Sequence, residues 1–105
     1  MPKRGVFTPK IVSYTAMIAS SLIEPEELES QAPMIAKHVK KAIGNVGLRL
    51  RTLREGVYYC GICEKGPFTK KGYFLHLTRL HYDYILELVE DEAERIASAS
   101  RRAGP

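Results

Sequence analysis

The chain has 105 residues, which allows one compact domain or two very small ones that support each other. Hydrophobic residues make up 45% and charged residues 27% of it, so a folded core is expected and a disordered tail is excluded. The formal net charge of +4 fits a nucleic acid or an acidic protein as the partner.

The first predicted element is an amphipathic helix over residues 9–23. Thr8 and Pro9 form a start signal, because a hydroxyl can cap the first turn and proline fits its first position. Helical spacing then relates Ile11, Thr15, Ile18 and Leu22. The stretch is too polar for the core of a secretory signal. Since no segment approaches about 18 continuous apolar residues, we expect no membrane partner and an intracellular, cytoplasmic location.

Two further helices are predicted before residue 44. Pro25 opens a short helix that runs through Gln31, with acidic side chains at its positive N-terminal end. A third helix is expected over residues 34–43, after a break at Pro33. The two glycines of the segment 44–47 then end it.

Residues 46–57 allow two readings. Apolar and basic residues alternate over 48–52, as in a half-buried strand, and the segment 54–56 would turn the chain into a returning strand at 57–59. Alternatively, helical spacing continues across the segment and gives one long helix that ends at Gly56. That helix would lose roughly 1 kcal/mol at each internal glycine relative to alanine. We favour the hairpin.

The order of three helices, a strand, a turn and a strand resembles the winged helix-turn-helix family. In that alignment the positions to be buried hold Leu28, Ala32, Met34, Val39 and Ala42. The resemblance implies a third helix that contacts DNA through outward-facing cations, at Lys37, Lys40 and Lys41. The hairpin would add Arg49, Arg51 and Arg54. No acidic residue interrupts these six cations, although a merely solvated helix face is the alternative interpretation.

Residues 58–82 contain both cysteines of the chain and two of its three histidines. The spacing C-x2-C-x12-H-x4-H relates Cys60, Cys63, His76 and His81, and it suits four ligands around one tetrahedral zinc ion. The segment resembles the Cys2His2 zinc-finger family, which implies one structural Zn2+ held by these side chains. Four protein ligands leave no open coordination position, and no other catalytic set is present. We therefore expect that the protein is not an enzyme.

The helix of this finger lacks side chains that read bases. Counted back from His76, the three reading positions hold Thr69, Gly72 and Leu75. Glycine reads nothing, and leucine can at best touch a thymine methyl group. Phosphates can still be held by Lys70, Lys71 and Arg79, which positions a protein without reading sequence. A small core is expected from Tyr58, Phe68, Tyr73 and Leu77.

The finger helix is predicted to continue unbroken from Lys71 to about Ala99, because its only glycine is Gly72 and it has no proline. One face carries an apolar stripe at Leu77, His81, Tyr84/Ile85, Leu88/Val89, Ala93 and Ile96. A stripe of this length must be covered, either by a second copy of the chain or by the first helix. We favour a homodimer through the C-terminal helix.

These features predict an α+β, mainly helical fold with three segments. They are a three-helix unit at 1–57, a Cys2His2 finger at 58–82 and a helix extension with a tail at 83–105. The leading functional hypothesis is a small DNA-binding transcriptional regulator that prefers duplex DNA and contains structural zinc. The alternatives are RNA or ribosome binding, and a protein-interaction module that uses the finger and the long helix.

Overall fold

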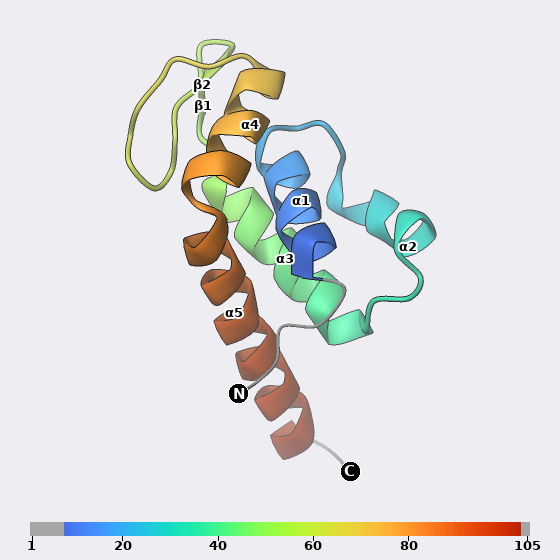
Figure 1. The fold of residues 1–105 in the computed structure, drawn as a ribbon. Helices are drawn as coiled ribbons and strands as arrows, with labels where there is room; N and C mark the ends of the chain where they lie inside the picture. The colour runs from blue at the N-terminus through green and yellow to red at the C-terminus, as the bar shows by residue number, and fades with distance from the viewer. Residues whose placement is uncertain (1–7, 104–105) are drawn as a thin grey trace.

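Helices dominate the chain in the computed structural model, which describes residues 8–103 (Figure 1). In chain order the elements are α1 (Thr8–Ala19), the 3-10 turn η1 (Pro25–Glu27), α2 (Leu28–Gln31), α3 (Lys37–Leu50), β1 (Leu53–Arg54), β2 (Val57–Tyr58), α4 (Lys70–Leu80) and α5 (Tyr82–Ala103). The strands form a two-stranded antiparallel sheet, so the expected α+β, mainly helical class is confirmed. Within the described residues, no helix combines the length and the apolar character needed to cross a bilayer.

α1 buries one face completely. Its core-facing side chains are Val12, Thr15, Ala16, Ile18 and Ala19. The helix ends at Ala19 rather than at residue 23, because the chain turns through Ser21 with a φ of 62°. Leu22, which was predicted to lie on the helical stripe, is exposed as a result.

The short helix predicted over residues 25–31 is present as two pieces, η1 and α2. The side chains of Glu24 and Glu27 form a capping box at its start. The helix-turn-helix alignment is wrong at Met34, which is 48% exposed although the pattern requires burial. This residue lies in the connection between α2 and α3, where it does not face the core.

The strand predicted over residues 48–52 is wrong, because α3 continues through Gly44 and Gly47 to Leu50. Gly47 lies against α1, and a Cβ built on it would come within 2.7 Å of the Ile18 side chain. The missing side chain lets the two helices approach closely. Burial against α1 therefore offsets the low helix propensity of glycine, which is about 1 kcal/mol below alanine. The helical reading of this region is correct as far as Leu50.

The predicted turn and returning strand are present in a shorter hairpin. β1 and β2 pair with the register Leu53↔Tyr58 and Arg54↔Val57. Both residues of the loop 55–56 have positive φ angles, 49° and 85°. This is the backbone geometry that matches the twist of a two-residue hairpin. The predicted wing thus consists of only two residue pairs.

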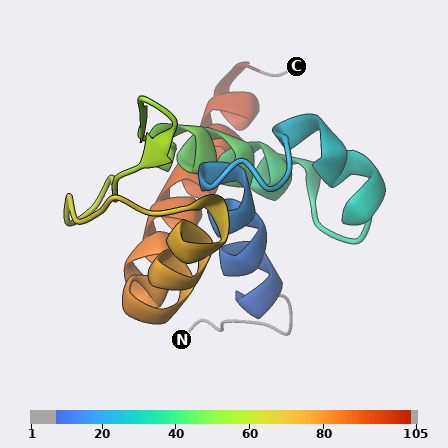
Figure 2. The ribbon, with the colours of Figure 1, turned by 90° about the horizontal axis from the view of Figure 1, so that it is seen from above.

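The predicted continuous C-terminal helix is broken at His81, between α4 and α5. α5 lies along α3 and α1, as Figures 1 and 2 show. Its buried side chains are Ile85, Leu86, Val89 and Ala93. Most of the apolar stripe is therefore covered within the chain, mainly by α3, while Tyr84 stays exposed. The buried part of the stripe needs no second copy to cover it, and the homodimer stays a prediction.

One hydrophobic core runs through all three predicted segments, with buried members in α1, α3, α4 and α5. The helix α4 of the 58–82 segment packs on α1. The Tyr58 hydroxyl donates a hydrogen bond to the Ser21 hydroxyl oxygen, 2.6 Å away. The cysteine- and histidine-rich segment is therefore built onto the helical unit.

Candidate metal centre and charged surfaces

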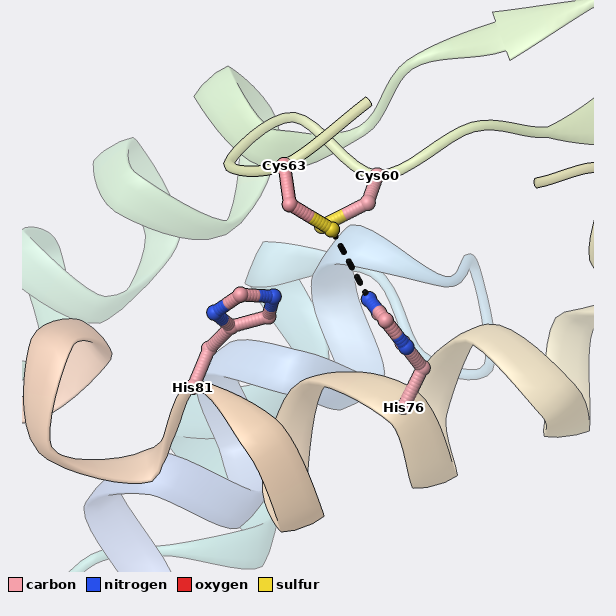
Figure 3. Close-up of side chains that lie close together, drawn as sticks. All are labelled: Cys60, Cys63, His76 and His81. Atoms are coloured by element: carbon pink, nitrogen blue, oxygen red, sulfur yellow. Dashed lines mark hydrogen bonds between the residues drawn. The ribbon is translucent and has the colours of Figure 1, made fainter. Parts of the chain in front are cut away.

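Two cysteines and two histidines converge beside the start of α5 (Figure 3). Cys60 and Cys63 lie in the loop after β2, His76 lies on α4, and His81 lies in the break between α4 and α5. One ligand atom from each residue lies within 4.8 Å of all the others. The Cys63 Sγ and the His76 Nε2 are 3.4 Å apart. The structure thus brings all four predicted ligands together.

The dimensions of this cluster fit one tetrahedral metal ion. Zn–S bonds of about 2.3 Å and Zn–N bonds of about 2.0–2.1 Å would place sulfur and nitrogen ligands about 3.6 Å apart. The Cys63–His76 distance is close to that value. In addition, the His81 Nε2 is buried and has no hydrogen-bond partner among the described residues. An unpaired buried nitrogen is unfavourable, and coordination to a metal would satisfy it.

The break at His81 follows from the spacing of the two histidines. In a regular α-helix, residues five apart point about 140° away from each other. His76 and His81 could therefore not bind one ion from an unbroken helix. His81 leaves the helix with φ −125° and ψ 25°, and its ring comes within 5.0 Å of the His76 ring, centroid to centroid.

Backbone groups shape the loop that carries the cysteines. The N–H of Cys60 donates to the carbonyl of Lys65 (2.8 Å), and the N–H of Glu64 donates to the carbonyl of Cys60 (2.9 Å). The N–H of Ile62 points at the Cys60 sulfur, 3.3 Å away. Gly61 allows a close approach to α3, since a Cβ there would lie 3.3 Å from the Leu50 Cα.

Burial shifts the pKa of three of these side chains, those of Cys60, His76 and His81. Burial raises the pKa of the Cys60 thiol, while N–H groups of Cys63 and Ile62 act in the opposite direction. Burial also lowers the pKa of both His76 and His81, which favours neutral imidazoles. Neutral imidazole is the form that binds a metal.

The expected small core beside the ligands is present. Tyr73 and Leu77 are fully buried, Tyr58 is buried, and Phe68 is partly buried. The Tyr73 ring stacks between those of Tyr58 and Phe68, at centroid distances of 5.7 and 5.9 Å. Phe68 also contacts the His76 ring at 4.6 Å. The ligand-bearing helix is therefore held against the cysteine loop by aromatic packing.

The role of the Tyr73 hydroxyl was missed at the sequence level. This hydroxyl donates to the carbonyl of Leu50 and accepts a hydrogen bond from the N–H of Gly61. It thus joins α3, the cysteine loop and α4. Cys2His2 fingers usually have leucine at this position, so the tyrosine indicated a special role. Its hydrogen-bond partners could not be identified from the sequence.

Among the described residues, three of the nine predicted phosphate-binding residues form ion pairs with acidic side chains of the chain. Lys40 is only 9% exposed and pairs with Glu29 at 3.1 Å. Arg51 donates to the carbonyl of Ile18 in α1 and to that of Ile23 in the loop after it, and it pairs with Glu24 at 3.2 Å. Arg49 is exposed but pairs with Glu92 of α5 at 3.4 Å. Two of these side chains, on Lys40 and Arg51, support the packing of α2 and α1 rather than an open surface.

The other six cations are exposed and lie in two places. Lys37 and Lys41 line a shallow groove of about 500 Å3 between η1–α2 and α3. The remaining four belong to the end of the molecule that carries the hairpin and α4, namely Arg54, Lys70, Lys71 and Arg79 (Figure 1). Arg54 lies over the Tyr59 ring, 4.9 Å from its centroid. The first two thus lie apart from the four at the hairpin end, and the nine cations do not share one face.

Charge is distributed unevenly along the second half of the chain. From Arg49 to Leu80 there are seven cations and two acids, whereas Tyr82 to Glu94 contains six acids and no cation. The first stretch includes Lys65, a cation of the cysteine loop that was not among the predicted contacts. We call the end formed by the hairpin, the cysteine loop and α4 the finger end. It is basic, and α5 leads away from it (Figure 1).

Comparisons with protein-family models, with curated proteins and with solved structures give no match to this chain. The interpretation of the site therefore depends on its geometry and chemistry.

Proposed function

We propose that the chain is a zinc-containing, nucleic-acid-binding protein in which the metal is structural. The observation that carries the zinc assignment is the convergence of four ligand atoms around a buried, unpartnered His81 Nε2. Cys60, Cys63, His76 and His81 would bind one Zn2+ through two sulfurs and two nitrogens. A complete tetrahedral shell leaves no position for a substrate, so the ion supplies stability and not catalysis. We accordingly propose that the protein is not an enzyme.

The arrangement around the site supports a Cys2His2 finger. β2 leads into the cysteine loop, Phe68 pairs with Tyr58 in an antiparallel bridge, and α4 follows. This is the order strand, loop, strand and helix of a ββα finger. The N-terminal helices are proposed to be its support, since α1 packs on α4 and the Tyr73 hydroxyl bonds to Leu50 of α3.

The partner proposed for this finger is nucleic acid, bound through phosphates. At the finger end the exposed cations Lys70, Lys71 and Arg54 are joined by Lys65. Base reading is not supported, because the Thr69 hydroxyl accepts a hydrogen bond from the N–H of Gly72 and so caps its own helix. Contacts of this kind bind duplexes independently of sequence. Duplex DNA, and with it a role in transcriptional regulation, is our leading assignment, and RNA is the alternative.

Zinc binding is tested by native mass spectrometry of the intact chain. One zinc ion for each chain is expected. The variant Cys63→Ser should lose the metal, because it removes one of the four candidate ligands. A chain that carries no zinc after purification with added Zn2+ would contradict the assignment.

Nucleic-acid binding is tested by fluorescence anisotropy with a DNA duplex and a structured RNA of equal length, at several salt concentrations. Replacing Lys70 and Lys71 by alanine should weaken binding and reduce the slope of log affinity against log salt by about 1 to 2 units. The matched control replaces Lys37 and Lys41, which lie on the α3 groove. A larger loss in the control would move the contact to α3, and tighter binding of RNA would replace DNA as the partner.

A further inference from the structure

Two large apolar side chains project into solvent where α4 meets α5. Leu80 is 67% exposed and Tyr84 is 49% exposed. They lie on either side of the break at His81. Leu80 also ends a shallow groove of about 420 Å3 on α4, whose apolar walls are Phe68 and Leu75. The same groove is lined by His76, a candidate metal ligand, whereas Leu80 and Tyr84 are neither ligands nor members of the buried core.

Opposite charges flank these apolar side chains. Arg79 precedes Leu80, Asp83 precedes Tyr84, and both charged residues are exposed. In the part of the chain that the structure describes, neither residue forms an ion pair. We call Arg79, Leu80, Asp83 and Tyr84 the junction patch. It contains one cation, one anion and two apolar side chains, so it is complementary to itself.

We propose that the junction patch is the contact surface of a two-fold symmetric dimer of this chain. A two-fold axis beside His81 would set the helices of the two copies antiparallel. Residues at equal distances before and after position 81 would then face each other, so Arg79 of one copy meets Asp83 of the second copy, and the reverse. Leu80 and Tyr84 would be covered between the two pairs.

The charges on the two sides of the break are also opposite in sign. α4 contains no acidic residue, and α5 contains no cation before Arg95. Because the chain breaks between α4 and α5 at His81, the pairing applies to the residues beside the break. Of the predicted apolar stripe, the patch contains Tyr84, which is exposed, and none of the buried members.

The contact area of such a dimer is small, so association should be weak and sensitive to salt. The test is sedimentation equilibrium on the zinc-loaded full chain without nucleic acid, from micromolar to submillimolar concentration, at low and high salt. A mass that rises toward that of a dimer at low salt and falls back at high salt is expected. A monomeric mass at the highest concentration in low salt would overturn the proposal.

Exchanging the charges of Arg79 and Asp83 distinguishes this specific contact from non-specific association. Arg79→Glu and Asp83→Lys should each weaken dimerisation by about tenfold, because each repulsion occurs twice in a symmetric dimer. The combined variant should regain dimerisation, because the pair is re-formed with reversed signs. A matched control is Lys37→Glu, a reversal away from the patch that should leave dimerisation unchanged. If the combined variant is no better than the single variants, the junction patch is not the interface. The dimer test uses no nucleic acid, so its outcome does not depend on whether the protein binds nucleic acid.

Discussion

The phenol hydroxyl of Tyr73 on α4 donates a hydrogen bond to the main-chain carbonyl of Leu50, the last residue of α3. The same hydroxyl accepts a hydrogen bond from the N–H of Gly61, which lies between the two cysteines. A single oxygen atom thus connects the helical unit, the cysteine loop and the ligand-bearing helix. The candidate metal site is therefore joined to the helical core by hydrogen bonds.

Removing this hydroxyl should destabilise the protein without removing the ligands. We expect Tyr73→Phe to cost about 1–3 kcal/mol of unfolding free energy, because it leaves the Leu50 carbonyl of a buried hydrogen bond and the Gly61 N–H of a partly buried one without their partner. Thermal denaturation of the zinc-loaded protein measures the loss. Tyr84→Phe is the matched control, since Tyr84 is exposed and should lose almost nothing. Equal losses of stability in the two variants would mean that the hydrogen bonds of the Tyr73 hydroxyl do not stabilise the fold.

Removing the metal should unfold residues 58–82 and loosen α5. A zinc site forms only in the folded state, so its binding free energy adds to folding by several kcal/mol in a chain this small. Hydrogen exchange with and without a chelator locates the change, and it should be greatest in the cysteine loop and around His81. Retention of full thermal stability after chelation would contradict this prediction.

The two glycines of α3 should respond in opposite ways to alanine. A Cβ at Gly47 would meet the Ile18 side chain at 2.7 Å, whereas one at Gly44 would meet Pro25 at 3.4 Å, an ordinary contact. Gly47→Ala should therefore destabilise by about 1–3 kcal/mol through overpacking. Gly44→Ala should be neutral or gain up to about 1 kcal/mol from helix propensity. Urea unfolding of the two variants gives the comparison, and the same sign for both would refute it.

Acid should weaken the contact between α3 and α5 through Glu92. Hydrogen bonds from Arg95 and Asn45, with the charges of Arg95 and Arg49 nearby, hold the pKa of Glu92 at about 2 against an ordinary value of 4.5. The folded state therefore favours the ionised form. Its contribution is complete above the unfolded pKa and is lost as the pH falls from 4.5 towards 2.

The variant Glu92→Gln isolates this effect. Its melting temperature should fall less than that of the natural chain between about pH 5 and about pH 2. Zinc release occurs in both proteins and cancels in the difference. Glu87→Gln, a change at an exposed position of the same helix, serves as the control and should follow the natural chain. Parallel curves for all three proteins would exclude a role for Glu92.

The convergence of the four candidate ligands could be predicted from the sequence, because coordination chemistry restricts both residue types and spacing. The spacing of the two histidines also indicates a break in the helix. His76 and His81 are five positions apart and cannot share an ion on a straight helix, so the break at His81 was implicit in the motif. The regular apolar periodicity across residues 77–96 predicted a continuous helix instead, because periodicity is preserved across a local bend.

The extent of α3 could not be predicted in the same way. Gly44 and Gly47 are poor helix formers, and their local preference favoured a helix end. What decides the outcome is the contact between Gly47 and Ile18, which are far apart in the sequence. The internal contacts of Lys40 and Arg51 could not be predicted for the same reason. Their partners include Glu29 and the Ile18 carbonyl of α1, and only the tertiary fold brings these together.

The basic finger end and the acidic stretch Tyr82–Glu94 of α5, which is followed by Arg95, Arg101 and Arg102, should give the molecule an electric dipole. Near a polyanion, such a dipole experiences a torque that turns the basic end forward before any contact is made. The encounter would then be oriented, with the acidic helix trailing, and fewer collisions would be unproductive. Retention on a heparin column should accordingly exceed that of a protein of equal net charge whose charges are evenly spread.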